Sequence, residues 1–113
     1  MDENVKLLLE EVEENLKHLF ENKLTNIILY GSYARDDFDE ESDIDIIALV
    51  EEMEEKELKK YNEEIIELEI DLTIKYGIMP SIMVESKKYF MTHQNIEFLF
   101  QNVVRYGKAI YAA

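Results

Sequence analysis

Two carboxylates, Asp43 and Asp45, are separated by one residue in the sequence S-D-I-D-I. An apolar run at residues 46–50 follows them, so we expect a strand in which alternate side chains share a face. Both carboxylates would then point the same way, with Cα atoms about 6.5–7 Å apart from the rise of a strand. Such a pair repels itself unless a cation lies between its members. Mg²⁺ suits this position because it prefers a few carboxylate oxygens together with water and substrate phosphates.

A glycine and a serine, Gly31 and Ser32, precede Asp43 by ten intervening residues and directly follow another apolar run, residues 27–30. Glycine suits a tight turn where the backbone must come close to a ligand. Ser32 offers a hydroxyl and a main-chain N–H at the expected start of a short helix, and such groups bind phosphate. The motif therefore predicts a phosphate and metal site between two strands. The plainer alternative is a polar loop in which Asp43 is only a turn residue.

The whole pattern resembles the signature of minimal nucleotidyltransferases in the DNA polymerase β superfamily, through the words G-S-Y-A-R and S-D-I-D-I. The resemblance implies an α+β fold with a small mixed sheet flanked by helices. It also implies that Gly31 and Ser32 hold the triphosphate of ATP or another nucleotide. Asp43 and Asp45 would bind Mg²⁺, with room for two ions. Arg35 would add a positive charge to the phosphates, or else it is a surface arginine.

Residues 66–76 fit two kinds of secondary structure. Apolar and polar residues alternate with period two, which indicates a strand. Leu68, Leu72 and Tyr76 also fall on one helical stripe that ends at Gly77. The resemblance to a bacterial subgroup with a long helix before a strand favours the helix.

The position of a third carboxylate depends on this choice, because active family members usually place one more acid on the neighbouring strand. In a strand, Asp71 would be the third metal ligand, with Glu69 as the runner-up. In a helix, the neighbouring strand would be residues 78–85, with Ser81 at its central position and no obvious inward acid. Asp71 would then be a solvated helix residue.

The composition indicates one compact domain over residues 1–113, since 47% of the chain is hydrophobic. The net charge of −14 and the absence of a basic patch argue against stable binding to duplex nucleic acid. The lack of cysteine excludes disulfides and fits a cytoplasmic protein. We expect no signal peptide and no membrane span. The two histidines lack a helical partner, so zinc is unsupported.

The remaining pattern predicts the order of the other elements. The second strand is apolar on both faces after Asp45, which suggests a central strand covered on both sides. Asn95 would cap the last helix, and Gly107 would end it. We expect helices at 3–22, 51–68, 87–92 and before Gly107, strands at 25–30 and 43–50, and an extended piece at 109–111.

The small size leaves no room for a separate acceptor-binding domain. The resemblance implies a partner instead, a small helical protein of the HEPN type, which in some pairs is a toxin that its nucleotidyltransferase antitoxin modifies with AMP. Our first hypothesis is therefore a Mg²⁺-dependent enzyme that transfers AMP from ATP to a hydroxyl group. The second is a degenerate binding module that neutralises or scaffolds a partner. Self-association is left open. Exposure of Ile66, Ile70 and Ile74 would indicate an interface, whereas burial of these residues in the core is the favoured interpretation.

Overall fold

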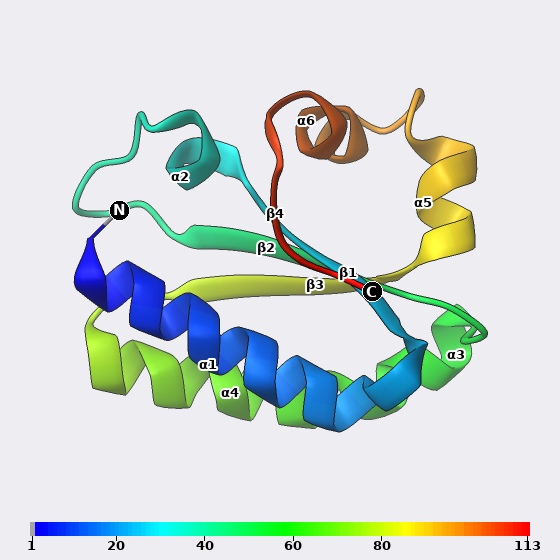
Figure 1. Cartoon of the computed structure of the whole chain (residues 1–113), viewed down its shortest axis with the longest axis horizontal. Helices are drawn as coiled ribbons and strands as arrows, with labels where there is room; N and C mark the ends of the chain where they lie inside the picture. Colours follow the sequence, from blue (N-terminus) through cyan, green and yellow to red (C-terminus); the bar gives the residue numbers. More distant parts are fainter. Residues whose placement is uncertain (1) are drawn as a thin grey trace.

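The computed structural model describes residues 2–113 as helices packed on a four-stranded sheet (Figure 1). The strands are β1 (Leu24–Tyr30), β2 (Ile44–Val50), β3 (Pro80–Ser86) and β4 (Lys108–Ala112). The helices are α1 (Glu3–Phe20), α2 (Gly31–Arg35), α3 (Glu55–Leu58), α4 (Asn62–Tyr76), α5 (Lys87–His93) and α6 (Phe98–Tyr106), with short 3-10 turns at Glu21–Lys23 and Lys59–Tyr61.

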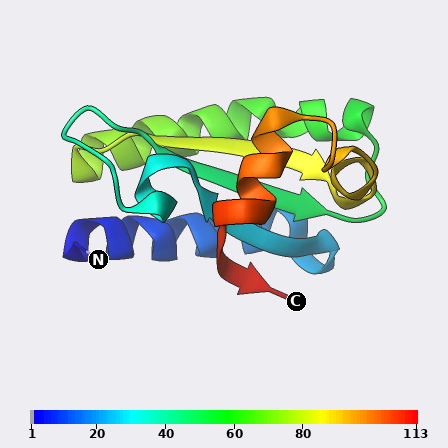
Figure 2. The same cartoon turned by 90° about the horizontal axis from the view of Figure 1, so that it is seen from above.

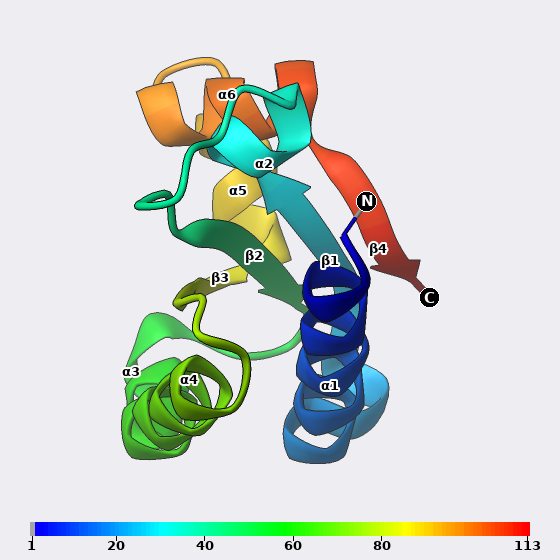
Figure 3. The same cartoon turned by 90° about the vertical axis from the view of Figure 1, so that its left-hand side faces the viewer.

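The sheet has the strand order β3-β2-β1-β4. Strand β1 pairs antiparallel with β2 and with β4, whereas β2 and β3 are parallel. Helices α1 and α4 cover one face, and α2, α5 and α6 lie over the other (Figure 3). The prediction of an α+β fold with a small mixed sheet flanked by helices is confirmed.

Strand β2 is covered on both faces, as its sequence predicted. Ile44, Ile46 and the following even-numbered residues pack into the core under α1 and α4. Ile47 and Leu49 pack into a second cluster with side chains of α5 and α6. Because side chains alternate along a strand, Asp45 lies on the face of α2, α5 and α6.

Residues 66–76 are helical, so the strand interpretation is wrong and the helix interpretation is confirmed. Helix α4 ends at Gly77, which has a φ of 73° in the left-handed region that favours glycine. The period-two pattern arises because three apolar residues on the surface of the helix alternate in sequence with the buried leucines. These are Ile66, Ile70 and Ile74, with exposed fractions of 52%, 53% and 79%. The opposite face of the helix packs against the core, and the stripe that includes Leu68 and Leu72 is buried there.

Several predicted boundaries are correct and two are wrong. Ser86 caps α5 by accepting the main-chain N–H of Tyr89 at 3.3 Å, and Gly107 ends α6. The stretch after β2 becomes helical only at Glu55. Asn95 does not cap α6, which begins three residues later without a side-chain cap. None of the helices in residues 2–113 is both long and apolar enough to cross a bilayer.

Candidate active site

A cavity of about 460 Å³ lies between the end of β1, the start of β2 and the helices α2 and α6, which lie side by side over the sheet (Figure 2). Four of the predicted site residues line it: Gly31, Ser32, Arg35 and Asp45. The other lining residues were not predicted and come from β1 and α6: Tyr30, Phe98, Leu99 and Asn102. The fold thus gathers most of the predicted motif around one opening.

Gly31 is required by the close approach of the β1–α2 turn to Asp45. Its φ of 72° lies in the left-handed region. A methyl group on its Cα would overlap the Asp45 Oδ2 and lie 3.1 Å from the Asp45 Cγ. The antiparallel register explains the contact, since Tyr30 pairs directly with Asp45. Only glycine lets this turn lie against the carboxylate.

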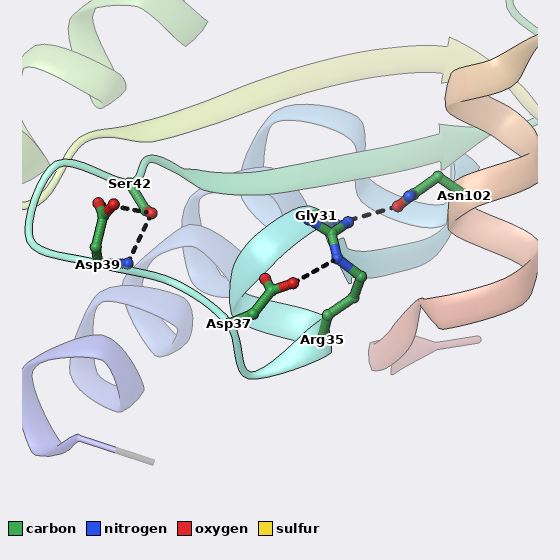
Figure 4. Close-up of polar contacts among 6 residues, drawn as sticks. All are labelled: Gly31, Arg35, Asp37, Asp39, Ser42 and Asn102. Atoms are coloured by element: carbon green, nitrogen blue, oxygen red, sulfur yellow. Dashed lines mark hydrogen bonds and ion pairs between the residues drawn. The ribbon is translucent and has the colours of Figure 1, made fainter.

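Asn102 holds the same turn from the other side. Its Oδ1 accepts a hydrogen bond from the main-chain N–H of Gly31 at 3.3 Å (Figure 4). The two residues are 71 positions apart, and α6 brings them together because Phe100 and Val103 bury its neighbouring face. The only sequence signal was a polar residue beside the apolar stripe of this helix, which is too common to indicate a site.

The environment of Asp45 disfavours a lone negative charge. Burial raises the pKa of the Asp45 carboxyl, the charge of Asp43 raises it further, and Arg35 opposes both. Asp43 is exposed and immediately precedes β2. Burial and the nearby Asp45 charge also raise the pKa of Tyr30 to about 12, so its hydroxyl stays protonated at neutral pH. The two aspartates therefore repel each other as their spacing predicted.

The donor set of this pair fits Mg²⁺. The ion is commonly bound through one or two carboxylates and completes its octahedron with water and substrate phosphates. Asp43 and Asp45 supply two such carboxylates, and the Ser32 hydroxyl lines the same cavity as Asp45. Within residues 2–113, no cluster of three or more histidine or carboxylate side chains is placed to hold a metal.

The fold does not bring a third carboxylate to the pair. Asp71 is exposed on α4, which packs on the opposite face of the sheet from Asp45, so its assignment as a third metal ligand is wrong. Glu69, the runner-up, accepts the main-chain N–H of Ile82 at 2.9 Å and ties α4 to β3. Ser81 stands beside Asp45 in the parallel register of β2 and β3.

Arg35 lies in the cavity wall and forms an ion pair with Asp37 at 3.2 Å. The acidic loop that follows makes contacts within itself. Asp39 accepts the Ser42 hydroxyl at 3.2 Å, and Ser42 accepts the Asp39 N–H at 3.0 Å (Figure 4). These contacts shape the turn between α2 and β2.

Comparisons with known proteins identify the family of this chain. The profile of a family described as "Nucleotidyltransferase domain" matches residues 9–104. The "Putative protein adenylyltransferase MJ0604" of Methanocaldococcus jannaschii is 34% identical over 96% of this chain and 99% of its own length.

Solved structures of low sequence identity share the fold. The crystal structure of a toxin–antitoxin with AMP-PNP superposes with a TM-score of 0.57 at 21% identity, covering 93% of this chain and 73% of that chain. The structure of a tri-AMPylated Shewanella oneidensis HEPN toxin in complex with MNT antitoxin gives 0.53 at 21%, covering 96% and 72%. The family match spans most of the chain and includes the Gly-Ser and Asp-x-Asp motif. The chain therefore belongs to the nucleotidyltransferase domain family, a family of enzymes.

Proposed function

We propose that the protein transfers AMP from ATP to a hydroxyl group of another protein. One observation carries the proposal: a single cavity brings the Gly31–Ser32 turn, Arg35 and Asp45 together, with Asp43 two residues before Asp45. A turn that offers a hydroxyl and a main-chain N–H, a cation and paired carboxylates are the groups needed to hold a triphosphate and its counterion.

The turn between β1 and α2 would bind the phosphates. Ser32 offers its hydroxyl and its main-chain N–H to phosphate oxygens. Arg35 adds the one positive charge among the residues that line the cavity. Asn102 occupies the Gly31 N–H and so fixes the direction in which the turn faces. Together these groups would hold the triphosphate in one orientation beside Asp45.

Asp43 and Asp45 would hold Mg²⁺, which when bound supplies charge neutralisation for the triphosphate and its leaving group. The acceptor oxygen forms a bond to the α-phosphorus. The bond from that phosphorus to the bridging oxygen breaks, and pyrophosphate leaves with the electron pair while the hydroxyl proton is lost to solvent. The protonated Tyr30 hydroxyl and the Arg35 guanidinium are further hydrogen-bond donors among the residues that line this cavity.

A protein is the acceptor class that the relatives support. The relative with nearly full coverage is named a protein adenylyltransferase, and one neighbouring structure holds a tri-AMPylated HEPN toxin in complex with an MNT antitoxin. We propose a HEPN-type partner for this chain and a cytoplasmic place of action. The net charge of −14 also favours docking to a basic protein surface.

The test uses purified protein, Mg²⁺ and ATP labelled at either the α- or the γ-phosphate, with an extract of the source cells as the source of acceptors. We expect a protein band labelled from α-labelled ATP only, with the mass increase of one AMP. The double variant Asp43→Asn/Asp45→Asn should abolish the label. Asp71→Asn removes the same kind of carboxylate on the far side of the sheet and should leave the label unchanged.

The same experiment separates the binding-only alternative, which the serine at position 81 beside Asp45 favours. A module without chemistry would give no label with any nucleotide. It would still retain its partner equally well in the wild-type protein and in the double variant. Label from the γ-phosphate would instead indicate phosphoryl transfer and contradict the proposal.

A further inference from the structure

A second and larger cavity, of about 810 Å³, lies at the far end of β2 and β3, where α3 and α5 flank the sheet (Figure 2). Its apolar side chains are Met53, Met83, Leu99 and Phe100. Met53 and Phe100 also belong to the buried core, so this floor is rigidly packed. Nothing in the proposed chemistry of AMP transfer uses this space.

The walls of this cavity are strongly negative. Six glutamates line it: Glu52, Glu54, Glu55, Glu57, Glu85 and Glu97. Lys88 is the single basic residue in the lining. Two of these glutamates accept hydrogen bonds from neutral donors: Glu97 from the Tyr89 hydroxyl and Glu85 from the Ser86 main-chain N–H, both at 3.0 Å. An apolar floor under an excess of carboxylates complements a ligand with an aliphatic stem and a cationic head.

Glu85 and Glu97 are the two carboxylates of this lining that are not fully exposed, and Glu85 is the one on the sheet. It lies on β3 and is half-buried. Burial raises the pKa of its carboxyl, and the charges of Glu55 and Glu97 raise it further, although the Ser86 N–H and His93 oppose them. Its side chain therefore sits where the negative charges of α3 and of the α5–α6 connection meet, and a cation there would relieve their repulsion.

The second cavity continues from the candidate active site. Leu99 lines both. In the parallel register of β2 and β3, Ser81 lies beside Asp45 and Glu85 lies beside Leu49, on the same face of the sheet. Four residues of strand separate the two levels, which is about 13 Å at the rise of a strand. An extended peptide covers that distance with about four residues.

We propose that this cavity binds a lysine or arginine side chain of an extended segment of the protein acceptor. The aliphatic stem packs on Met53, Met83 and Phe100, and the cationic head meets Glu55 and Glu85. The basic residue then lies about four positions from the hydroxyl that receives AMP. That spacing rests on the proposed function, whereas the preference of the cavity for a basic side chain does not.

The methionine side chains of the protein can be used as NMR probes of binding in this cavity. Met53 and Met83 line it, whereas Met79 and Met91 do not. We would label the methionine methyl groups with ¹³C and titrate the blocked peptide Ala-Tyr-Ala-Ala-Ala-Arg-Ala. The matched control peptide carries glutamine in place of arginine. We expect saturable shifts of the Met53 and Met83 methyl signals with the arginine peptide alone, while the Met79 and Met91 signals stay in place.

A pair of charge-matched variants completes the test. Glu55→Gln/Glu85→Gln should raise the Kd of the arginine peptide about fivefold or more, from the loss of two partly exposed ion pairs. Glu63→Gln/Glu67→Gln makes the same charge change on the exposed face of α4 and should change the Kd by less than about twofold. Unchanged Met79 and Met91 signals will show that the first variant is folded.

Equal binding of the two peptides, equal weakening by the two variants, or unshifted Met53 and Met83 signals would overturn the proposal. Its failure is distinguishable from failure of the AMP-transfer reaction. Asp45→Asn should abolish AMP transfer and leave peptide binding unchanged, because the carboxylate lies about 13 Å from the level of Glu85 along the strands.

Discussion

The close approach of Gly31 to Asp45 predicts that Gly31→Ala is severely damaging. Two costs are added by this one methyl group. A left-handed conformation costs a residue with a Cβ about 1–2 kcal/mol. The new Cβ also overlaps the Asp45 Oδ2, with the Asp45 Cγ at 3.1 Å and Cβ at 3.2 Å, and overpacking of this kind costs about 1–3 kcal/mol. We expect the free energy of unfolding to fall by about 2–5 kcal/mol.

The chain contains a matched control for the backbone part of this cost. Gly77 has a φ of 73°, and an added Cβ there would meet no atom within 4 Å. Gly77→Ala should therefore cost only the left-handed penalty, about 1–2 kcal/mol. Thermal unfolding followed by circular dichroism measures both, since 1 kcal/mol shifts the Tm by about 4–8 °C in a domain near 100 residues.

A double-mutant cycle isolates the clash. In the Asp45→Ala background the overlapping oxygen is gone, so Gly31→Ala should cost at least about 1 kcal/mol less than in the wild-type chain. AMP transfer by Gly31→Ala alone should fall about 100-fold or more, because displacement of a reacting group by about 1 Å has that effect. If Gly31→Ala and Gly77→Ala are equally destabilising, and Asp45→Ala leaves the cost unchanged, the reasoning from this contact is refuted.

Three further predictions concern single side chains. The raised pKa of Asp45 means that its negative charge destabilises the folded state at neutral pH. Asp45→Asn should therefore raise the Tm by about 2–5 °C at pH 7. This gain in Tm should shrink as the pH falls toward 3.8, the ordinary pKa of an aspartate, and an equal gain at pH 4 would contradict the argument from the Asp45 charge. Asn102→Ala removes the acceptor oxygen for the Gly31 N–H and should lower the kcat of AMP transfer about tenfold or more, and an unchanged kcat in the labelling assay would contradict its role in holding the turn. Glu69→Ala leaves the Ile82 N–H without its acceptor and should cost about 1–3 kcal/mol, and an unchanged denaturation midpoint in urea would count against that role.

Local patterns were sufficient for the parts of the fold that depend on neighbouring residues. The apolar residues of β2 predicted a strand covered on both sides, and Gly77 predicted the end of α4. Residues 66–76 were ambiguous because three isoleucines on the outer face of α4 imitate a strand. Periodicity reports spacing and cannot show which apolar residues the fold buries.

The unpredicted parts of the site come from contacts across the chain. Phe98, Leu99 and Asn102 reach the cavity because α6 packs over β1, far from the motif in sequence. The assignment of Asp71 failed for the same reason, since it depended on the register of a strand that is a helix. A motif identifies the residues of its own turn, whereas the residues that complete a cavity depend on tertiary packing.

The hydrogen bond that the Gly31 N–H donates to Asn102 affects the time at which the site forms during synthesis. The ribosome completes the Gly-Ser and Asp-x-Asp motif by residue 45, yet the side chain that holds the turn arrives 71 residues after Gly31. Strand β4, which pairs with β1 directly behind that turn, is made later still. A nascent chain therefore carries the full motif with its Gly31–Ser32 turn unsupported, and we expect it to bind the proposed substrate ATP only when α6 and β4 are in place.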